Sequence, residues 1–319
     1  MIKQYPVDLV YLWCDGSDPN FQERRNAALE RTNKKQDRQA IAEGRVVQVD
    51  ELKYSLRSVE KYMPWIRHVF IVTDRQVPAW LNTENPKVTV VDQSEILPSS
   101  ALPSFNSNAI EAALYKIPNL SEHFLYANDD MFVNRKIEPS FFFTASGKII
   151  IRAKHRPFHP NSLYDRQLEQ AQEKILISFH KHYRFDPHHN IDPYLKSDFQ
   201  ACAEYFHEEF ETTVHHTFRQ QDSIQRLIVH LFSLVKKHAI IRKANASRIQ
   251  RTFRSLYRPK ISSVNIPNNR LFIALRRRLF RYKPALFCIN DSENGTFEDR
   301  ICTKKFLESY FPEKSSFEK

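Results

Sequence analysis

Glycine is scarce in this chain, at four of the 319 residues. Neither GxGxxG nor GxxxxGK[ST] occurs, so the glycine-rich backbone loops that cradle phosphates in many nucleotide-binding proteins are excluded. Collagen-like, propeller-like and glycine-rich linker architectures are excluded for the same reason. Any phosphate that the chain binds must therefore be held by other groups.

The cysteines are few and scattered. Cys14, Cys202, Cys288 and Cys302 form no C-x-x-C pair, which argues against a zinc or redox motif and favours a reducing compartment. No apolar run approaches the ~20 residues of a membrane span. The first apolar run ends in DGSD rather than in a small-residue cleavage site. We therefore expect a cytoplasmic protein.

The formal net charge of +11 is concentrated in one segment. Residues 236–283 contain 15 Lys and Arg and no acidic residue, which leaves 33 basic and 37 acidic residues elsewhere. Such a segment is attracted to nucleic acid, acidic lipid or an anionic polymer, although a solvated helix face is the simpler alternative. Within it, Arg270–Tyr282 places Leu271, Leu275 and Leu279 on one helical face. This pattern suits peripheral contact with the inner face of a membrane, guidance of an anionic polymer, or packing on the core.

Apolar runs alternate with helical patterns in the first half of the chain. We predict strands at Val7–Trp13, His68–Thr73, Lys87–Val91, His123–Ala127, Lys148–Arg152 and Ala285–Ile289. We predict helices from Pro19 to about Ile41 and at Asp50–Tyr62, Asn106–Lys116, 163–177, 196–210, 221–238 and Glu298–Tyr310. This alternation predicts an α/β fold of the Rossmann-like (GT-A-like) kind. Its mostly parallel sheet would be flanked by helices and followed by a helical, basic C-terminal part.

Acidic residues follow at least four of the predicted strands: Asp15, Asp74, Asp92 and Asp129–Asp130. Ligands of open α/β sheets bind at the carboxyl ends of strands, but a single acid there is more often a turn former. A vicinal pair is different, because two adjacent carboxylates repel each other and a hard divalent cation relieves the repulsion. Asp129 and Asp130, joined by Asn290 and Asp291, therefore predict a Mg²⁺ (or Mn²⁺) site for a diphosphate. Ordinary turn chemistry is the alternative.

Several long stretches of the chain resemble one protein family. They are YLWCDGSDP, ELKYSLRSVEKYMPWIRHVFIVTDRQVPAWL, LPSFNSNAIEAALYKIPNLSEHFLYANDDMF, HNIDPYLKS, HTFRQQDSI and CINDS, in this order across residues 7–292. The pattern resembles the four blocks of the Stealth family. These are bacterial capsular-polysaccharide hexose-1-phosphate transferases, similar to the catalytic subunit of animal N-acetylglucosamine-1-phosphotransferase. The chain departs from the family at Leu12 and Cys14, and at His189–Pro193, where the family often has H-x-P-x-P.

The resemblance implies a reaction. A hydroxyl of an oligosaccharide or lipid-linked polysaccharide acceptor attacks the β-phosphorus of a UDP-sugar, which we expect to donate N-acetylhexosamine-1-phosphate. UMP leaves and a phosphodiester forms. A metal-dependent glycosyltransferase that releases UDP is the alternative. A nucleic-acid binder acting through the basic segment is a third reading, but the chain carries no known nucleic-acid motif, so we expect no nucleic-acid partner.

The resemblance also implies roles for residues. His189 matches the family's histidine and suits a general base, with its neighbour His188 as a rival. Arg219 suits a phosphate clamp because its planar fork holds two oxygens at once. Lys196 would assist as a point charge, and His216 would orient its neighbours or touch the phosphate.

The expected nucleotide-binding residues are Asp15, Gly16, Arg57, Asn106, Asn108 and Asn128. Asp15 follows the first strand, where uridine or ribose is expected. Arg57 sits on a helix that should face the site, with a salt bridge to a sheet carboxylate as the alternative. Asn106 and Asn108 would cap a helix whose N-terminus points at phosphate, although capping alone explains them equally well.

We divide the chain into four parts. Residues 1–155 form the nucleotide-sugar-binding core, 156–238 a helical acceptor and catalytic region, 239–284 a basic membrane- or polymer-binding insertion, and 285–319 a strand and helix that complete the core. The second part is rich in histidine, but it lacks H-E-x-x-H, so we do not expect a zinc site there.

Overall fold

The computed structural model describes residues 5–32, 48–154, 162–244, 263–267, 283–290 and 296–319. The predicted helix at Arg270–Tyr282 and the end of the one predicted from Pro19 to Ile41 lie outside the described residues. Among the described helices, none is long and apolar enough to cross a bilayer.

The central sheet has five strands in the order β3-β2-β1-β4-β8. Their bounds are β1 Val7–Leu12, β2 His68–Thr73, β3 Val88–Asp92, β4 His123–Asn128 and β8 Asp192–Leu195. The first four strands are parallel, and β8 runs antiparallel to β4, with Tyr126 opposite Asp192 and His123 opposite Leu195. The predicted α/β class with a mostly parallel sheet is therefore confirmed.

Two three-stranded sheets adjoin the central one. The first has the order β10-β11-β5 and the second β7-β6-β9. Their bounds are β5 Met131–Val133, β6 Ile149–Lys154, β7 Asp186–Pro187, β9 Ala239–Lys243, β10 Ser263–Pro267 and β11 Leu286–Asn290. Both β9 and β10 come from the basic segment, so part of that segment belongs to the packed fold.

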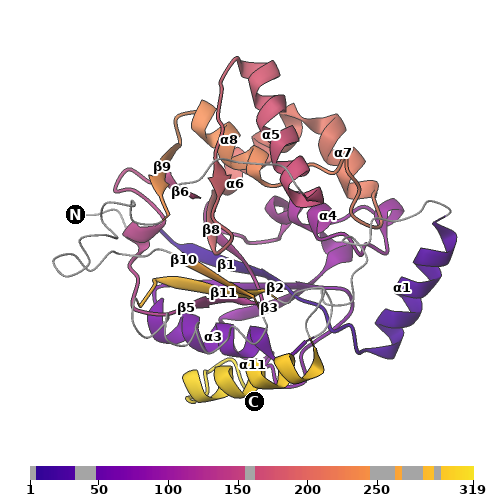
Figure 1. The fold of residues 1–319 in the computed structure, drawn as a ribbon, viewed down its shortest axis with the longest axis vertical. Coiled ribbons are helices and arrows are strands. Elements are labelled where there is room, and N and C mark those ends of the chain that lie inside the picture. The colour runs from indigo at the N-terminus through magenta and orange to yellow at the C-terminus, as the bar shows by residue number, and fades with distance from the viewer. Residues whose placement is uncertain (1–4, 33–47, 155–161, 245–262, 268–282, 291–295) are drawn as a thin grey trace.

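Helices cover both faces of the central sheet (Figure 1). On one side lie α4 Ser107–Ala112, α5 Leu163–Phe179, α6 Lys196–Tyr205, α7 His207–His215 and α8 Leu227–Val235. On the other lie α3 Glu51–Tyr62 and α11 Phe297–Tyr310, while α1 Pro19–Arg31 projects at the edge. Short 3-10 turns occupy Gln93–Glu95, Ser99–Ala101, Leu114–Lys116 and Pro139–Phe141.

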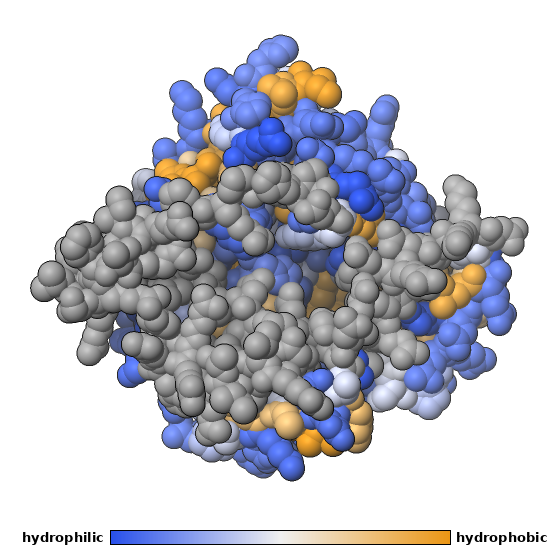
Figure 2. All heavy atoms as spheres, viewed as in Figure 1, coloured by the Kyte–Doolittle hydropathy of each residue, from blue (hydrophilic) through white to orange (hydrophobic). Residues whose placement is uncertain are grey.

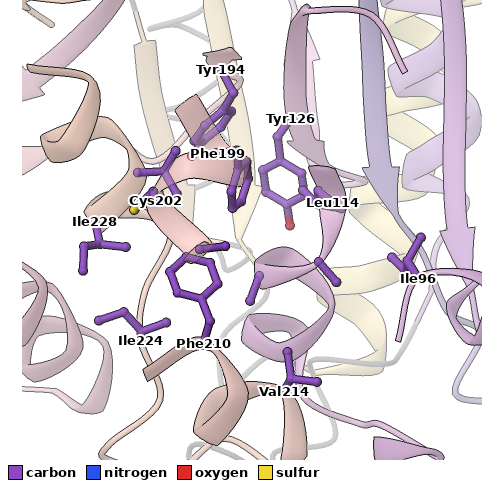
Figure 3. Packing of buried hydrophobic residues seen from close by; sticks show 14 of the residues in the cluster. Ile96, Leu114, Tyr126, Tyr194, Phe199, Cys202, Phe210, Val214, Ile224 and Ile228 are labelled. Carbon is purple, nitrogen blue, oxygen red and sulfur yellow. The ribbon is translucent and has the colours of Figure 1, made fainter. Parts of the chain in front are cut away.

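The strands are buried on both faces, as parallel strands usually are. Phe124 and Tyr126 of β4 face α5–α8, whereas the alternate residue Leu125 faces α3. Figure 3 shows the first of these cores, where the rings of Tyr194 and Phe199 lie with centroids 5.6 Å apart. Phe124 stacks on Tyr194, with centroids 5.5 Å apart. Each fully buried aromatic side chain contributes about 1.5–3 kcal/mol. This packing fixes the positions of the strand ends.

The structure differs from the prediction in three places. The pattern at 196–210 is two helices, α6 and α7, interrupted at Phe206, and the pattern at 221–238 shortens to α8. The strands β5, β7, β8, β9 and β10 were not predicted, because each is short and most carry polar or proline residues. The proline in β8, Pro193, is tolerated because β8 lies at the edge of the central sheet.

Candidate functional site at the carboxyl end of the sheet

The strand order places a switch point between β1 and β4. The chain proceeds from β1 to β2 and β3 on one side, and β4 then returns to the other side of β1. In α/β sheets the crevice at the carboxyl ends of two such strands is the usual ligand site. The residues that follow β1 and β4 therefore meet where a ligand is expected.

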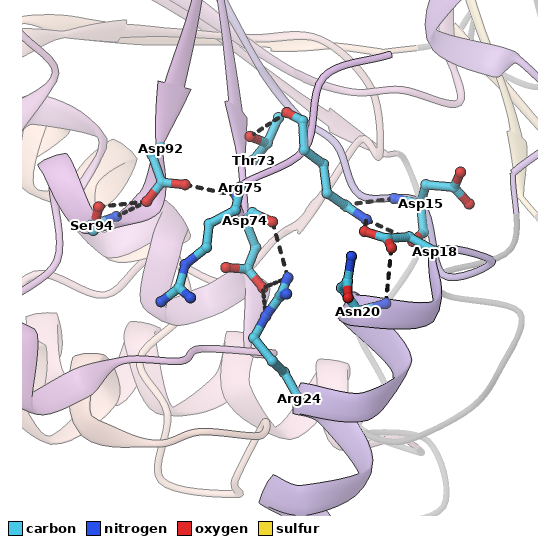
Figure 4. A network of polar contacts seen from close by, with 10 residues as sticks. Asp15, Asp18, Asn20, Arg24, Thr73, Asp74, Arg75, Asp92 and Ser94 are labelled. Carbon is cyan, nitrogen blue, oxygen red and sulfur yellow. Dashed lines mark hydrogen bonds and ion pairs between the residues drawn. The ribbon is translucent and has the colours of Figure 1, made fainter. Parts of the chain in front are cut away.

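The acids that follow β1, β2 and β3 are engaged in local structure (Figure 4). The Oδ1 atom of Asp15 accepts bonds from the amide and hydroxyl of Ser17, at 2.8 and 2.6 Å. Asp74 is paired with Arg24 at 2.8 Å, and Asp92 caps the turn at Gln93–Glu95. Asp15 and Asp92 fit the turn-former alternative, whereas Asp74 is held in an ion pair with α1.

The pair Asp129–Asp130 forms the two-residue connection between β4 and β5. Asp129 Oδ2 accepts a 2.8 Å bond from the Gln48 amide, and Gln48 in turn accepts one from the Trp13 indole. Asp130 Oδ2 accepts a 3.2 Å bond from the Cys288 thiol. The other oxygen of Asp130 is buried and meets no hydrogen-bond donor among the described residues. A buried carboxylate oxygen without a donor is costly unless a cation or another donor reaches it.

A third carboxylate, Glu51, joins the pair and was not predicted. It is the first residue of α3 and accepts a 2.7 Å bond from the Val49 amide. Burial and the charge of Asp129 raise the pKa of Glu51, and burial raises the pKa of Asp129. Burial and Asp129 together raise the pKa of Asp130 to about 7. Ionising three neighbouring acids is unfavourable because their negative charges repel one another, and a bound divalent cation would offset this repulsion. In the sequence, Glu51 looked like an ordinary residue of a helix start.

The thiol of Cys14 lies close to acids that follow both β1 and β4. Burial raises its pKa to about 12, and the charges of Asp129, Asp15 and Asp74 contribute in the same direction. Asp15 therefore lies within electrostatic reach of the same thiol as Asp129. The next residue, Gly16, accepts a 2.8 Å bond at its carbonyl from Gln22 of α1.

His189 lies beside Asp130. A ring nitrogen of His189, a carboxylate oxygen of Asp130 and the sulfur of Cys288 all lie within 4.8 Å of one another. Burial and the nearby charges of Arg226 and Lys154 lower the pKa of His189 to about 3. The half-buried imidazole is therefore neutral near pH 7, and the lowered pKa makes its free nitrogen a weaker base than that of an exposed histidine.

The neighbouring His188 is locked in place. Its Nε2 atom lies 2.8 Å from Asp192 Oδ1, and both side chains are buried. Burial opposes ionisation of Asp192, yet the paired His188 and other nearby cations hold its pKa at about 2. The imidazole of His188 thus anchors the segment that presents His189.

Arg226 links the ends of β4 and β8. Its guanidinium lies 2.8 Å from Glu111, 3.6 Å from Asp192 and 4.6 Å from the ring centre of Tyr126. The Tyr126 hydroxyl donates to Asn128 Oδ1 at 2.7 Å. Arg226 therefore packs on the tyrosine that positions the Asn128 side chain. Nothing in the sequence around Arg226 indicated that it supports the site in this way.

Arg219 lies on the same side of the sheet. Its guanidinium donates to the hydroxyl of Ser107, the first residue of α4. Burial raises the pKa of Tyr126 well above its usual value, and the Arg219 charge acts against that rise. Arg219 therefore lies within electrostatic reach of the residue that holds Asn128.

The two asparagines of the α4 start are used within the protein. Asn106 caps α4 by accepting a 3.1 Å bond from the Asn108 amide, and it donates to the carbonyl of His216 at 3.1 Å. The Asn108 side chain donates to Gln167 at 3.0 Å. The predicted capping is confirmed for Asn106, whereas Asn108 lies inside α4 and does not cap it. The bond from Asn106 to the His216 carbonyl ties that residue to the start of α4.

Two predicted site residues lie elsewhere. Lys196 follows the antiparallel strand β8, so its amide bonds the carbonyl of Glu122 at the opposite end of β4. Arg57 is held by both carboxylate oxygens of Glu318, at 2.8 and 2.6 Å. The structure does not bring either side chain to the carboxyl end of the sheet.

The last two predicted metal ligands follow the end of β11. The amide of Ile289 bonds the carbonyl of Asp130 at 3.0 Å, so the backbone of the next residue, Asn290, continues past the acid pair. Asp291 lies outside the described residues. The view in Figure 2 shows a largely hydrophilic described surface with scattered apolar patches.

The fold and site together define an α/β protein with three clustered acids, Glu51, Asp129 and Asp130, at the switch point of a mostly parallel sheet. Residues 5–32 match the model of Stealth protein conserved region 1, and residues 45–151 match that of conserved region 2. The chain belongs to the Stealth family.

Relatives with curated names were found in several bacteria. An exopolysaccharide phosphotransferase of Streptomyces coelicolor is 35% identical over 99% of this chain and 53% of its own length. One of Lactiplantibacillus plantarum is 29% identical over 99% of this chain and 97% of its own. A capsular polysaccharide phosphotransferase of Actinobacillus pleuropneumoniae is 44% identical over 46% of this chain and 40% of its own. The chain thus spans about half the length of the Streptomyces relative.

A solved structure was also similar. The galactosyltransferase LgtC, crystallised with donor and acceptor sugar analogues, aligns with 97% of this chain and 96% of its own at 13% identity and a TM-score of 0.44.

Proposed function

We propose that the chain transfers a hexose-1-phosphate, of the N-acetylhexosamine class, from a UDP-sugar to a hydroxyl of an acceptor sugar, with release of UMP. The names of its relatives, exopolysaccharide and capsular polysaccharide phosphotransferases, support the reaction class. The observation that carries the proposal is the crowding of Asp129, Asp130 and Glu51 beside His189, with one buried Asp130 oxygen that no described donor meets.

The acid cluster fits a hard divalent cation. Carboxylate oxygens are the ligands that Mg²⁺ and Mn²⁺ prefer, and Asp129 and Asp130 would hold the ion with Asn290 and Asp291. When bound, such an ion neutralises the diphosphate of the donor and the charge that develops on it. Glu51 adds a third carboxyl group to this centre from the start of α3.

The chain's own residues supply positioning and proton transfer. His189, neutral near pH 7, accepts the proton of the attacking hydroxyl, while the bond from His188 to Asp192 keeps the segment in place. Arg219 holds phosphate oxygens with its planar fork, and the carbonyl of His216, bound to Asn106, steadies that segment. Asp15, Gly16 and Asn128 line the nucleotide side of the proposed site.

Product analysis tests the proposal. The full chain is incubated with Mg²⁺, an acceptor oligosaccharide and a panel of UDP-sugars, and the products are analysed by mass. A phosphodiester-linked product with stoichiometric UMP is expected. Release of UDP with a simple glycosidic product would instead indicate a glycosyltransferase and overturn the proposal.

A further inference from the structure

Three chemically different ligand atoms converge beside the acid cluster. The carboxylate of Asp130, a ring nitrogen of His189 and the sulfur of Cys288 lie within 4.8 Å of one another. The Cys288 thiol donates to one oxygen of Asp130 at 3.2 Å, and the other oxygen is buried without a described donor. The sequence could not show this set, because its members lie far apart along the chain.

Each of the three residues is held by a different, well-packed element. Cys288 is opposite Met131 in the antiparallel pairing of β11 with β5. Asp130 lies at the start of that pairing, where its carbonyl accepts the bond from β11. His189 follows the anchored His188 and lies edge-on to the Tyr164 ring, with centroids 6.3 Å apart. The three atoms therefore converge without a long flexible side chain, which lowers the cost of ordering a bound ion.

The donor set is not one that a hard cation selects. Mg²⁺ and Mn²⁺ prefer oxygen, whereas Zn²⁺ takes thiolate, imidazole and carboxylate together in a tetrahedral shell. We propose that Asp130, His189 and Cys288 bind a thiophilic divalent cation of the Zn²⁺ class, in competition with the oxygen-bound cation of the proposed function, with which this set shares Asp130. One ion binds, the Cys288 thiol loses its proton to solvent, and water completes the fourth position.

Binding of this ion has a functional consequence that rests on the proposed function. The ion occupies His189, the proposed proton acceptor, and Asp130, a proposed Mg²⁺ ligand. It therefore inhibits transfer, and a high Mg²⁺ concentration opposes the inhibition by competing for Asp130. The site would make the enzyme sensitive to free zinc.

Cobalt provides a direct probe that needs no substrate. The metal-free full chain is titrated with Co²⁺ alone, and absorption is recorded in the near ultraviolet and the visible. We expect thiolate-to-cobalt charge transfer with the visible bands of tetrahedral Co²⁺ at one ion per chain, reversed by Zn²⁺. In Cys288→Ser the charge-transfer band disappears, and Zn²⁺ affinity falls on the order of tenfold or more.

Two other cysteines serve as matched controls. Cys302 is exposed on α11, and Cys14 lies near Asp129 but outside the three-residue set. Cys302→Ser and Cys14→Ser should keep the band, and His189→Ala should lose the tetrahedral visible bands. Absence of the band in the parent chain, or its survival in Cys288→Ser, overturns the proposal. If Cys288→Ser fails to fold, His189→Ala decides, because survival of the tetrahedral visible bands in that variant also overturns the proposal.

The activity measurement separates this inference from the proposed function. Zn²⁺ should lower the transfer rate of the parent chain, and Cys288→Ser should need more Zn²⁺ for the same fractional loss of its own rate. Equal sensitivity of the two proteins contradicts the inhibitory role. If neither protein transfers sugar phosphate under any condition, the proposed function fails, while the cobalt spectra still decide whether the site exists.

Discussion

Arg226 and Glu111 form a buried ion pair, with nitrogen and oxygen 2.8 Å apart and side chains 7% and 4% exposed. The same guanidinium faces Asp192 at 3.6 Å, so one arginine at the N-cap of α8 neutralises two buried acids. Asp192 anchors His188, and Glu111 accepts a bond from the Tyr126 hydroxyl that also binds Asn128. This pair therefore connects the interior of the fold to both strand ends of the site.

Removal of one partner should be strongly destabilising. Arg226→Met leaves two buried carboxylates without their cation, and we expect a loss of about 3–5 kcal/mol in the free energy of unfolding, measured with urea. Arg226→Met combined with Glu111→Leu should recover part of this loss. The exposed pair Lys61–Glu313 is the control, because Lys61→Met should cost less than about 1 kcal/mol. Similar losses in the two single variants would contradict the role of burial.

The raised pKa of Asp130 predicts how metal-free stability depends on pH. The folded carboxyl keeps its proton up to about pH 7, whereas the unfolded one loses it near pH 4. Stability contributed by Asp130 is therefore present at low pH and declines as the pH rises from about 4 to about 7.

Asp130→Asn should remove this decline. At pH 8 without metal, we expect this variant to be more stable than the parent chain by on the order of 1–3 kcal/mol in urea unfolding. Added Mg²⁺ should stabilise the parent chain and not the variant. Asp15→Asn, whose carboxylate is engaged by Ser17, is the control and should keep the decline. An unchanged pH profile in Asp130→Asn would exclude Asp130 as the titrating group.

Substitution of the two adjacent histidines should affect different properties: catalysis for His189 and stability for His188. His189→Ala should lower kcat by about 100- to 10,000-fold, as expected for loss of a general base, and should leave the unfolding curve nearly unchanged. His188→Ala breaks a buried bond to Asp192, so it should lower stability by about 1–3 kcal/mol. Steady-state kinetics and urea unfolding measure the two effects. Full activity in His189→Ala would end its assignment as the base.

Two cationic residues should differ in the same way. Arg219→Lys removes the planar fork beside α4 and should raise KM for the UDP-sugar and lower kcat. Lys196→Ala, at the opposite end of β4, should leave both constants unchanged. A loss in Lys196→Ala as large as that in Arg219→Lys would place the site elsewhere.

The basic segment predicts salt-dependent association with anionic surfaces. Sedimentation with vesicles that contain acidic lipid should fall as ionic strength rises past about 0.15 M, because exposed charges are screened beyond about 8 Å. Neutral vesicles are the control. Association that does not respond to salt would argue against an electrostatic role for residues 236–283.

The sequence predicted the main sheet well, since long buried strands such as His68–Thr73 carry an unambiguous apolar pattern. It also placed Asp129 and Asp130 at a strand end, because chain order alone fixes that position. Short edge strands were missed, since a segment such as Asp192–Leu195 has no period long enough to detect. The misplacement of Lys196 has the same cause, because the unrecognised strand reverses the chain direction just before it.

Other parts of the site depend on tertiary contacts that no local pattern encodes. Glu51 is an ordinary helix-start residue until α3 packs beside Asp129. Cys288 reads as a buried apolar residue until β11 pairs with β5. The alternative for Arg57, a salt bridge, was right in kind, but the partner is Glu318 and not a carboxylate of the sheet.

The pairing of β11 with β5 brings Cys288 to Asp130, and β8 brings His189 to the same place. During synthesis the parallel strands emerge first, and Asp130 lacks its neighbour Cys288 until residue 288 has left the ribosome. A nascent chain arrested before residue 288 therefore holds Asp130 without the Cys288 thiol, even after its parallel strands have paired.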